Sequence, residues 1–423
     1  MKEDFLHYVW QFSQFNGADL KTTTKEKIQI IKPGLMNNNA GPDFLQAQIF
    51  IDEVKWIGNV EVHLKSSDWY IHKHEQDKNY DAVILHVVYE DDVTVFAKNN
   101  KPLPTLELKG KIPDDLIQRY KALLNSKNKI PCANQIHLVD DFVMNNWLER
   151  LYIQRLEHKS VLIEKLLQEN HKDYEAVLFQ LLAKNFGLKV NAEVFLALAK
   201  RIDFSVFRKE WFNVDKLSAL LFGEAGFLNE EIENDYYQYL KKEYEYQKIK
   251  YKLTGERKNQ FQFFRIRPNN FPTIRIAQLV ALYVKNQGLF SKIMNLKKVE
   301  DFYGVFKIEI PEFWKTHYTF EKESKKSSKG FTKPFINLLL INTIIPLKYV
   351  HAKFKFNNNE FDYLKLLTQL PKESNSIISN FHDLELSINN AFDSQSLLEL
   401  NNSFCAKKRC LHCSVGTFLL KKQ

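Results

Sequence analysis

The sequence predicts an α+β protein, with a mixed β-sheet domain over residues 1–112 and a larger all-helical region over residues 113–423. Between residues 26 and 108, short runs rich in β-branched and aromatic residues alternate with turn-forming segments, as a mixed or antiparallel sheet requires. From about residue 113 onward, apolar residues recur at three- and four-residue steps, which is typical of amphipathic helices. A chain of 423 residues is long enough to build a separate core for each part.

An opening helix and a series of strands are expected in the first domain. Phe5, Val9 and Trp10 lie at roughly helical spacing, so residues 1–15 should contain a helix. The candidate strands are KIQIIKP, FLQAQIFI, VKWIGNVEVHL, AVILHVVYE, VTVFA and PTLELK. The segments NNNAGPD, HEQDKNYD and KNNKPLP separate them and are rich in residues that favour turns.

The helical region should begin at PDDLIQRYKALL, where Pro113 and two aspartates occupy the first turn. The segment VDDFVMNNWLERLYIQRLEHKSVLIEKLLQ then predicts a long amphipathic helix. The most apolar run, FINLLLINTIIPL (residues 335–347), is too short to span a bilayer and contains two asparagines, so a buried helix is expected. The N-terminal segment lacks a signal-peptide hydrophobic stretch, and a cytoplasmic protein without membrane association is therefore expected.

The charge of the chain favours a polyanionic partner. A formal net charge of +9 and a pI near 9.0 suit nucleic acid, although a lysine-rich surface can also serve solubility alone. Within FQFFRIRPNNFPTIRIAQL, Arg265, Arg267 and Arg275 interleave with aromatic residues and are candidates for holding a nucleic-acid backbone. The alternative is a core helix whose arginines are paired internally. Neither G-x-G-x-x-G nor G-x-x-x-x-G-K-[ST] occurs, which excludes the usual Gly-rich nucleotide cradles.

Carboxylates and histidines gather in the predicted strands. Period-two alternation in VKWIGNVEVHL puts Glu61 and His63 on one face, and Asp43 opens the preceding strand. His86 is the one polar residue in the otherwise apolar strand AVILHVV. The loop that follows the E-x-H strand adds His72 and His74.

This set can bind a divalent cation, because carboxylates suit Mg²⁺ or Mn²⁺ and imidazoles also accept Mn²⁺ or Zn²⁺. Each residue also has a structural interpretation: Asp43 as a turn cap, Glu61 as the partner of a lysine, and the loop histidines as solvated side chains. His86 would then be a core histidine bonded to the backbone. Two titratable groups on one mid-sheet face nevertheless need a partner or a metal once they are buried.

The segments GPDF, GNVEVHLKSSDWYIHKH, YDAVILHVVYEDD, RPNNFPTIRIAQL, EFWKTHY and FCAKKRCLHC together resemble an uncharacterised bacterial family, known only as a domain of unknown function. The resemblance covers nearly the whole chain and implies no activity.

Residues 1–97 also resemble the PD-(D/E)xK nuclease-like fold of restriction endonucleases. In that fold a leading helix is followed by strands, and each of two strands carries one of the motif's acidic residues. Pro42-Asp43 matches the PD, Glu61 matches the second acid, and Glu3 stands where many of these nucleases carry an extra metal-binding glutamate. The resemblance implies that Asp43 and Glu61 bind Mg²⁺ or Mn²⁺, with Glu3 or His86 completing the shell. His63 replaces the motif lysine that orients the attacking water, and Lys65 on the same face is the candidate substitute.

The chain contains only four cysteines, Cys132, Cys405, Cys410 and Cys413, and the last three follow a C-x4-C-x2-C spacing. Four thiols suit Zn²⁺ or a [4Fe–4S] cluster, and His412 is an alternative fourth ligand. Ordinary buried thiols are the structural alternative. The arrangement is similar to helicase-associated and CRISPR-adaptation nucleases with an iron–sulfur cluster. Here Cys132 follows the predicted sheet domain, whereas in those proteins the isolated cysteine precedes the nuclease core.

These patterns favour a metal-dependent nuclease-like hydrolase that acts on DNA or RNA. The main alternative is a non-catalytic module that binds nucleic acid or protein and is stabilised by a metal. A third interpretation is a different metallohydrolase that uses the histidines.

Overall fold

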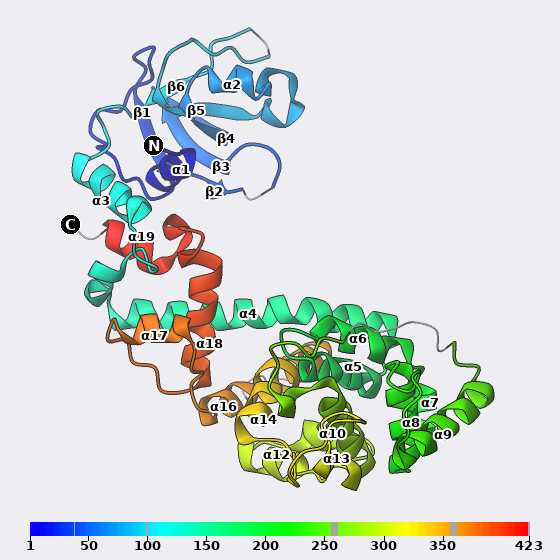
Figure 1. Cartoon of the computed structure of the whole chain (residues 1–423). Helices are drawn as coiled ribbons and strands as arrows, with labels where there is room; N and C mark the ends of the chain where they lie inside the picture. Colours follow the sequence, from blue (N-terminus) through cyan, green and yellow to red (C-terminus); the bar gives the residue numbers. More distant parts are fainter. Residues whose placement is uncertain (38, 99, 255–260, 356–361, 422–423) are drawn as a thin grey trace. The chain divides into compact units, whose positions relative to one another are not determined.

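The computed structural model describes residues 1–37, 39–98, 100–254, 261–355 and 362–421 (Figure 1). The chain forms two compact units. The first unit comprises Met1–Trp147 together with Leu400–Gln423, and the second comprises Leu148–Glu399. The predicted boundary at residue 112 therefore differs from the division in the structure, because residues 113–147 and the C-terminal segment fold with the sheet.

The first unit contains a mixed six-stranded sheet, as the sequence predicts. The strand order is β1-β3-β4-β5-β6, with β2 also paired to β3; β1, β3 and β4 are antiparallel neighbours, whereas β4, β5 and β6 run parallel. The predicted strand VTVFA is absent, and that described stretch makes only an isolated bridge between Phe96 and Pro102. The strands are β1 (Ile28–Lys32), β2 (Leu35–Met36), β3 (Phe44–Ile51), β4 (Val54–Lys65), β5 (Val83–Glu90) and β6 (Thr105–Glu107).

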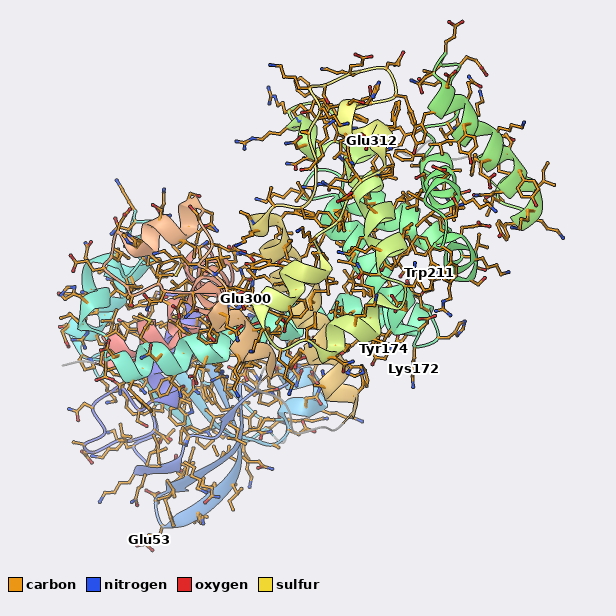
Figure 2. The ribbon with its side chains drawn as sticks, turned by 90° about the horizontal axis from the view of Figure 1, so that it is seen from below. Glu53, Lys172, Tyr174, Trp211, Glu300 and Glu312 are labelled. Carbon is orange, nitrogen blue, oxygen red and sulfur yellow. The ribbon has the colours of Figure 1, made fainter. Side chains whose placement is uncertain are left out.

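The β3–β4 hairpin and the β4–β5 pair set the orientation of the acidic and histidine side chains. A tight turn, with Glu53 at its tip, joins β3 to β4 (Figure 2). Glu61 on β4 pairs with His86 on β5, so the two side chains point to the same face. Gly58 allows the strands to approach closely, since a Cβ there would lie 2.4 Å from Ile84 Cγ2. The parallel β4–β5 pair requires a crossover, which is short and carries α2 (Asp68–Ile71), η1 (His74–Gln76) and η2 (Lys78–Tyr80).

The predicted opening helix is α1 (Glu3–Gln11), and it packs against β4 (Figure 1). Its apolar side buries residues such as Phe5 and Trp10, and the Trp10 indole donates a hydrogen bond to the Pro33 carbonyl at 3.0 Å. Its acidic first turn suits the positive end of the helix dipole. The helix therefore brings Glu3 close to the sheet.

Short helices that follow the sheet, together with short helices near the C-terminus, complete the first unit. They are α3 (Asp114–Asn125), η3 (Ala133–Leu138), η6 (Asn401–Cys405), η7 (Cys410–His412) and α19 (Ser414–Lys421). Tyr120 on α3 stacks on Phe5 with ring centroids 4.1 Å apart, and Arg119 donates to the Leu420 carbonyl at 3.2 Å. These contacts explain why α3 and α19 lie side by side and belong with the sheet (Figure 1).

The second unit consists of helices joined by loops, with no strand among its described residues beyond two isolated bridges, which confirms the predicted larger helical region. Its core contains the buried faces of most of these helices, including α5, α8 and α10. The unit boundaries fall within α4 and at the end of α18. The helices are α4 (Asp141–Glu169), α5 (Tyr174–Phe186), α6 (Ala192–Arg201), α7 (Phe204–Glu210), α8 (Val214–Glu224), α9 (Asp235–Tyr251), η4 (Pro268–Asn270), α10 (Pro272–Lys285), α11 (Leu289–Asn295), α12 (Val299–Val305), α13 (Glu312–Thr316), α14 (Lys333–Leu339), η5 (Leu340–Ile344), α15 (Ile345–Lys355), α16 (Asp362–Gln369), α17 (Ser376–His382) and α18 (Ala391–Leu400).

The apolar run at residues 335–347 belongs to continuous helical structure. Among the described residues, Lys333–Phe354 is the single helical stretch long and apolar enough to cross a membrane, with a mean hydropathy of 1.4. About two thirds of its most apolar window, 67%, is buried inside the protein. That burial is typical of a core helix in a soluble protein, as the sequence predicts.

Candidate metal centre

Two groups of side chains in the first unit have ligand atoms close enough to hold a cation. Within the described residues, these are the groups whose ligand atoms all lie within 4.8 Å of one another. One group comes from β4 and the following crossover, and the other from α1 and the start of β3. Their members are His63, His72 and His74, and Glu3, His7 and Asp43.

The histidine group has the spacing of a coordination shell. His63 Nε2 lies 3.1 Å from His72 Nδ1 and 3.5 Å from Glu61 Oε1, and His74 Nε2 lies 3.2 Å from the same oxygen. Four ligands bound tetrahedrally at about 2.0–2.1 Å stand roughly 3.4 Å apart. The three imidazoles therefore fit one divalent cation without large rearrangement, and the Glu61 carboxylate lies beside two of them.

The second group lies where α1 meets β3. His7 Nε2 is 3.2 Å from Asp43 Oδ2 and 3.7 Å from Glu3 Oε1. Glu3 and His7 are one helical turn apart, which places both side chains on the same side of α1. Burial alone would lower the pKa of His7, but the hydrogen bond and charge of Asp43 raise it above its usual value.

Glu61 connects the two groups. Its Oε2 accepts a hydrogen bond from the Asp43 backbone N–H at 3.0 Å, and Asp43 Oδ2 in turn accepts one from the Val62 N–H at 3.0 Å. The Glu61 side chain is almost fully buried, and burial raises its pKa despite the hydrogen bond to His74. Since burying a carboxylate is costly, a bound cation would compensate for the lost solvation.

His63 and His86 form a buried imidazole pair. His63 Nδ1 and His86 Nε2 are 2.9 Å apart, and both side chains are fully buried. Burial and the neighbouring imidazoles lower the pKa of His63 to about 2 and that of His86 to about 3, so both rings are neutral. A neutral His63 cannot replace the positive charge of the motif lysine, but it can bind a metal. His86 lies behind His63 and orients its ring.

Lys65 does not join this cluster. Its ammonium is exposed and lies 3.8 Å from Asp92 Oδ2. Its backbone N–H donates to Asp68 Oδ2 at 3.0 Å, at the start of the crossover. The position of the Lys65 side chain therefore does not support the prediction that Lys65 takes the place of the motif lysine.

A pocket opens beside the histidine group. It has a cavity volume of about 340 Å³, and its wall includes Trp69, His74, Tyr80 and Lys98. The Tyr80 ring stacks on His74 with centroids 3.8 Å apart. The pocket thus gives a ligand access to His74 past an aromatic ring and a cation.

The three candidate nucleic-acid-binding arginines lie in the second unit and differ in exposure. Arg265 and Arg267 are exposed. Arg275 is buried on α10, stacks 3.6 Å over the Phe335 ring, and donates to Gln278 Oε1 at 2.8 Å. Its contacts favour the core-helix interpretation and leave it unavailable to a nucleic-acid backbone.

All four cysteines are free thiols and belong to the first unit, where they line one small pocket. His412, the alternative ligand, is exposed and does not line it.

Of the candidate ligands, His7 is the one that the sequence patterns do not predict. The signal was present in the sequence, since Glu3 and His7 are four residues apart on a predicted helix. The sequence pattern groups the loop histidines with the other potential cation ligands, and the structure brings both to His63.

Residues 3–376 match the protein family of unknown function DUF2851. The chain belongs to this family, as the sequence motifs predict. The matched region contains both candidate cation-ligand groups and Cys132, and it ends before Cys405, Cys410 and Cys413. No curated protein and no solved structure shows significant similarity to the chain.

Proposed function

We propose that this protein is a cytoplasmic metal-dependent hydrolase that cleaves phosphodiester bonds of DNA or RNA. The observation that carries the proposal is the joint arrangement of Asp43 and Glu61. Asp43 immediately precedes β3, and Glu61 lies on the antiparallel neighbour β4. The Asp43 N–H donates to Glu61 and the Val62 N–H donates to Asp43, with an acid and a histidine from α1 on one side and three histidines on the other.

The order of elements also supports a nuclease-like domain. Helix α1 precedes the antiparallel strands β1, β3 and β4, and the crossover with α2 leads to the parallel strand β5. Asp43 stands at the entry of β3 and Glu61 lies within β4, which are the positions that the PD-(D/E)xK resemblance assigns to its two acids. Fold likeness alone does not define an activity, so the side-chain set must carry the proposal.

In this proposal the two groups hold two cations, with Glu61 between them. The nitrogen-rich set around His63 favours Mn²⁺ or Zn²⁺, whereas the set with Glu3 and Asp43 also suits Mg²⁺. A cation bound there would lower the pKa of a bound water and neutralise charge on a phosphodiester. The neutral His63 acts as a ligand, its ring held by His86. The pocket at His74 and Tyr80 admits the substrate.

The test is cleavage of labelled single- and double-stranded DNA and RNA by the purified full chain, with Mn²⁺, Mg²⁺ or Zn²⁺ added separately. Asp43→Asn and Glu61→Gln should reduce cleavage by at least about 100-fold, since even outer partners of metal ligands contribute 10- to 100-fold. Glu53→Gln is the matched control, because Glu53 is exposed at the tip of the same hairpin (Figure 2). Its activity should equal that of the wild type.

Other outcomes distinguish the alternatives. Nucleic-acid binding without cleavage under any metal would support the non-catalytic binding module. Hydrolysis of small phosphate or carboxylate esters without nucleic-acid cleavage would support a different metallohydrolase. Equal activity of Glu61→Gln and Glu53→Gln would show that the cluster is structural.

A further inference from the structure

The four cysteines come from three separate parts of the first unit and meet at one pocket. Cys132 precedes η3, Cys405 ends η6, Cys410 begins η7, and Cys413 follows η7. The gap between the thiols is small, with a cavity volume of about 10 Å³, and its seven lining residues come from the η3 end, the η6–η7 segment and α19. They are Pro131, Cys132, Phe404, Cys405, Cys410, Cys413 and Gly416.

The thiols surround the pocket at a wider spacing than one zinc ion needs. Four thiolates bound to Zn²⁺ at about 2.3 Å would stand roughly 3.8 Å apart. Across the described residues, the groups whose ligand atoms all lie within 4.8 Å contain no cysteine. A [4Fe–4S] cluster binds one thiolate at each of four iron corners, so its thiolates stand roughly 6 Å apart, across the width of the cube. The separation of the four thiols, rather than the size of the gap between them, therefore favours the larger group.

The surroundings of the sulfur atoms suit thiolates. The backbone N–H groups of Val415 and Gly416, at the start of α19, donate hydrogen bonds to Cys413. Such donors stabilise a negatively charged sulfur.

We propose that Cys132, Cys405, Cys410 and Cys413 bind one [4Fe–4S] cluster, which fastens the C-terminal segment to the sheet unit. Each thiol releases its proton when it binds an iron corner, and the four thiolates offset the positive charge of the cluster core. Lys408 reinforces the same attachment, because its ammonium donates to the Leu124 carbonyl at 2.7 Å, at the end of α3.

The experiment uses the full chain purified without oxygen and, in parallel, chain reconstituted with iron and sulfide. About four irons and four sulfides per chain, with broad visible absorption, are expected for one cluster. X-ray absorption at the iron edge should show both Fe–S and Fe–Fe distances, and this measurement needs no variant.

Cys405→Ser and Cys410→Ser should each lose most of the iron, whereas His412→Gln should keep it. If a cysteine variant does not fold, the wild-type iron and sulfide content and the Fe–Fe distance still decide the question. One zinc per chain with no bound iron, or no metal after reconstitution, would overturn the proposal.

Discussion

Gly416→Ala should release the proposed iron–sulfur cluster by displacing Cys410. Gly416 lies on α19 directly against the peptide of Cys410, and a Cβ there would stand 2.1 Å from the Cys410 carbonyl oxygen and 2.9 Å from its carbonyl carbon. Unbonded heavy atoms need about 3.2 Å or more, so either α19 or the Cys410 peptide must move by about 1 Å. Metal sites tolerate shifts of only about 0.2 Å in ligand distance.

Two opposing effects set the stability change. Replacing a helical glycine by alanine stabilises the helix by up to about 1 kcal/mol. Overpacking costs about 1–3 kcal/mol, and the upper end applies because the obstructing atoms are backbone atoms that cannot rotate away. The net loss is about 2 kcal/mol, which for a unit of 150–250 residues lowers Tm by about 4–8 °C.

The assay combines iron content after anaerobic purification with thermal unfolding followed by circular dichroism. Gly304→Ala on α12 is the matched control, because a Cβ at that helical glycine meets nothing within 4 Å. It should keep the wild-type iron content and leave Tm unchanged or slightly higher. Full iron content and unchanged Tm in Gly416→Ala would refute the reasoning.

Three further changes test other parts of the molecule. The Lys159 ammonium donates hydrogen bonds to the Ile341 carbonyl oxygen and to the Asn342 side-chain oxygen, and burial lowers the pKa of Lys159 to about 7. The unfolded chain therefore binds a proton that the folded chain releases, so the free energy of unfolding should fall as the pH drops towards 7. Urea unfolding at a series of pH values should show that Lys159→Met removes about 2–5 kcal/mol of this pH-dependent loss. Replacing Arg265 and Arg267 together by alanine should leave Tm unchanged and, if both contact phosphates, reduce the salt slope of nucleic-acid binding by about 2; an unchanged slope would exclude them from the interface. Tyr120→Ala removes the stack on Phe5 and should lower the free energy of unfolding of the sheet unit by about 3–5 kcal/mol, and a loss below about 1 kcal/mol would contradict the close packing of α1 on α3.

Local patterns predict most of the sheet and the shared face of Glu61 and His63, because side-chain alternation along a strand is a property of a few adjacent residues. The segment at 93–97 has the same alternation but forms no strand, since β4 and β6 already occupy both edges of β5. Strand pairing is thus decided by competition for edges, which the segment itself does not encode.

Long-range contacts limited the rest of the prediction. The return of residues 400–423 to the sheet unit depends on packing across almost the whole chain, so the helical signal after residue 112 could not place the boundary. Likewise, the position of His7 beside Asp43 depends on how α1 lies across the sheet. Its four-residue separation from Glu3 shows only that the two side chains share one helix face.

Helix α1 touches both β4 and η7 within the first unit, so the helix that carries Glu3 and His7 also lies against the loop that carries Cys410. If cluster binding restricts the motion of α1, it preorganises the cation ligands. Thermodynamic reciprocity then requires that cation binding strengthens retention of the cluster by the same factor. Iron retention measured with and without Mn²⁺ should reveal this coupling. The supply of metal to one centre would then affect how fully the other centre is occupied.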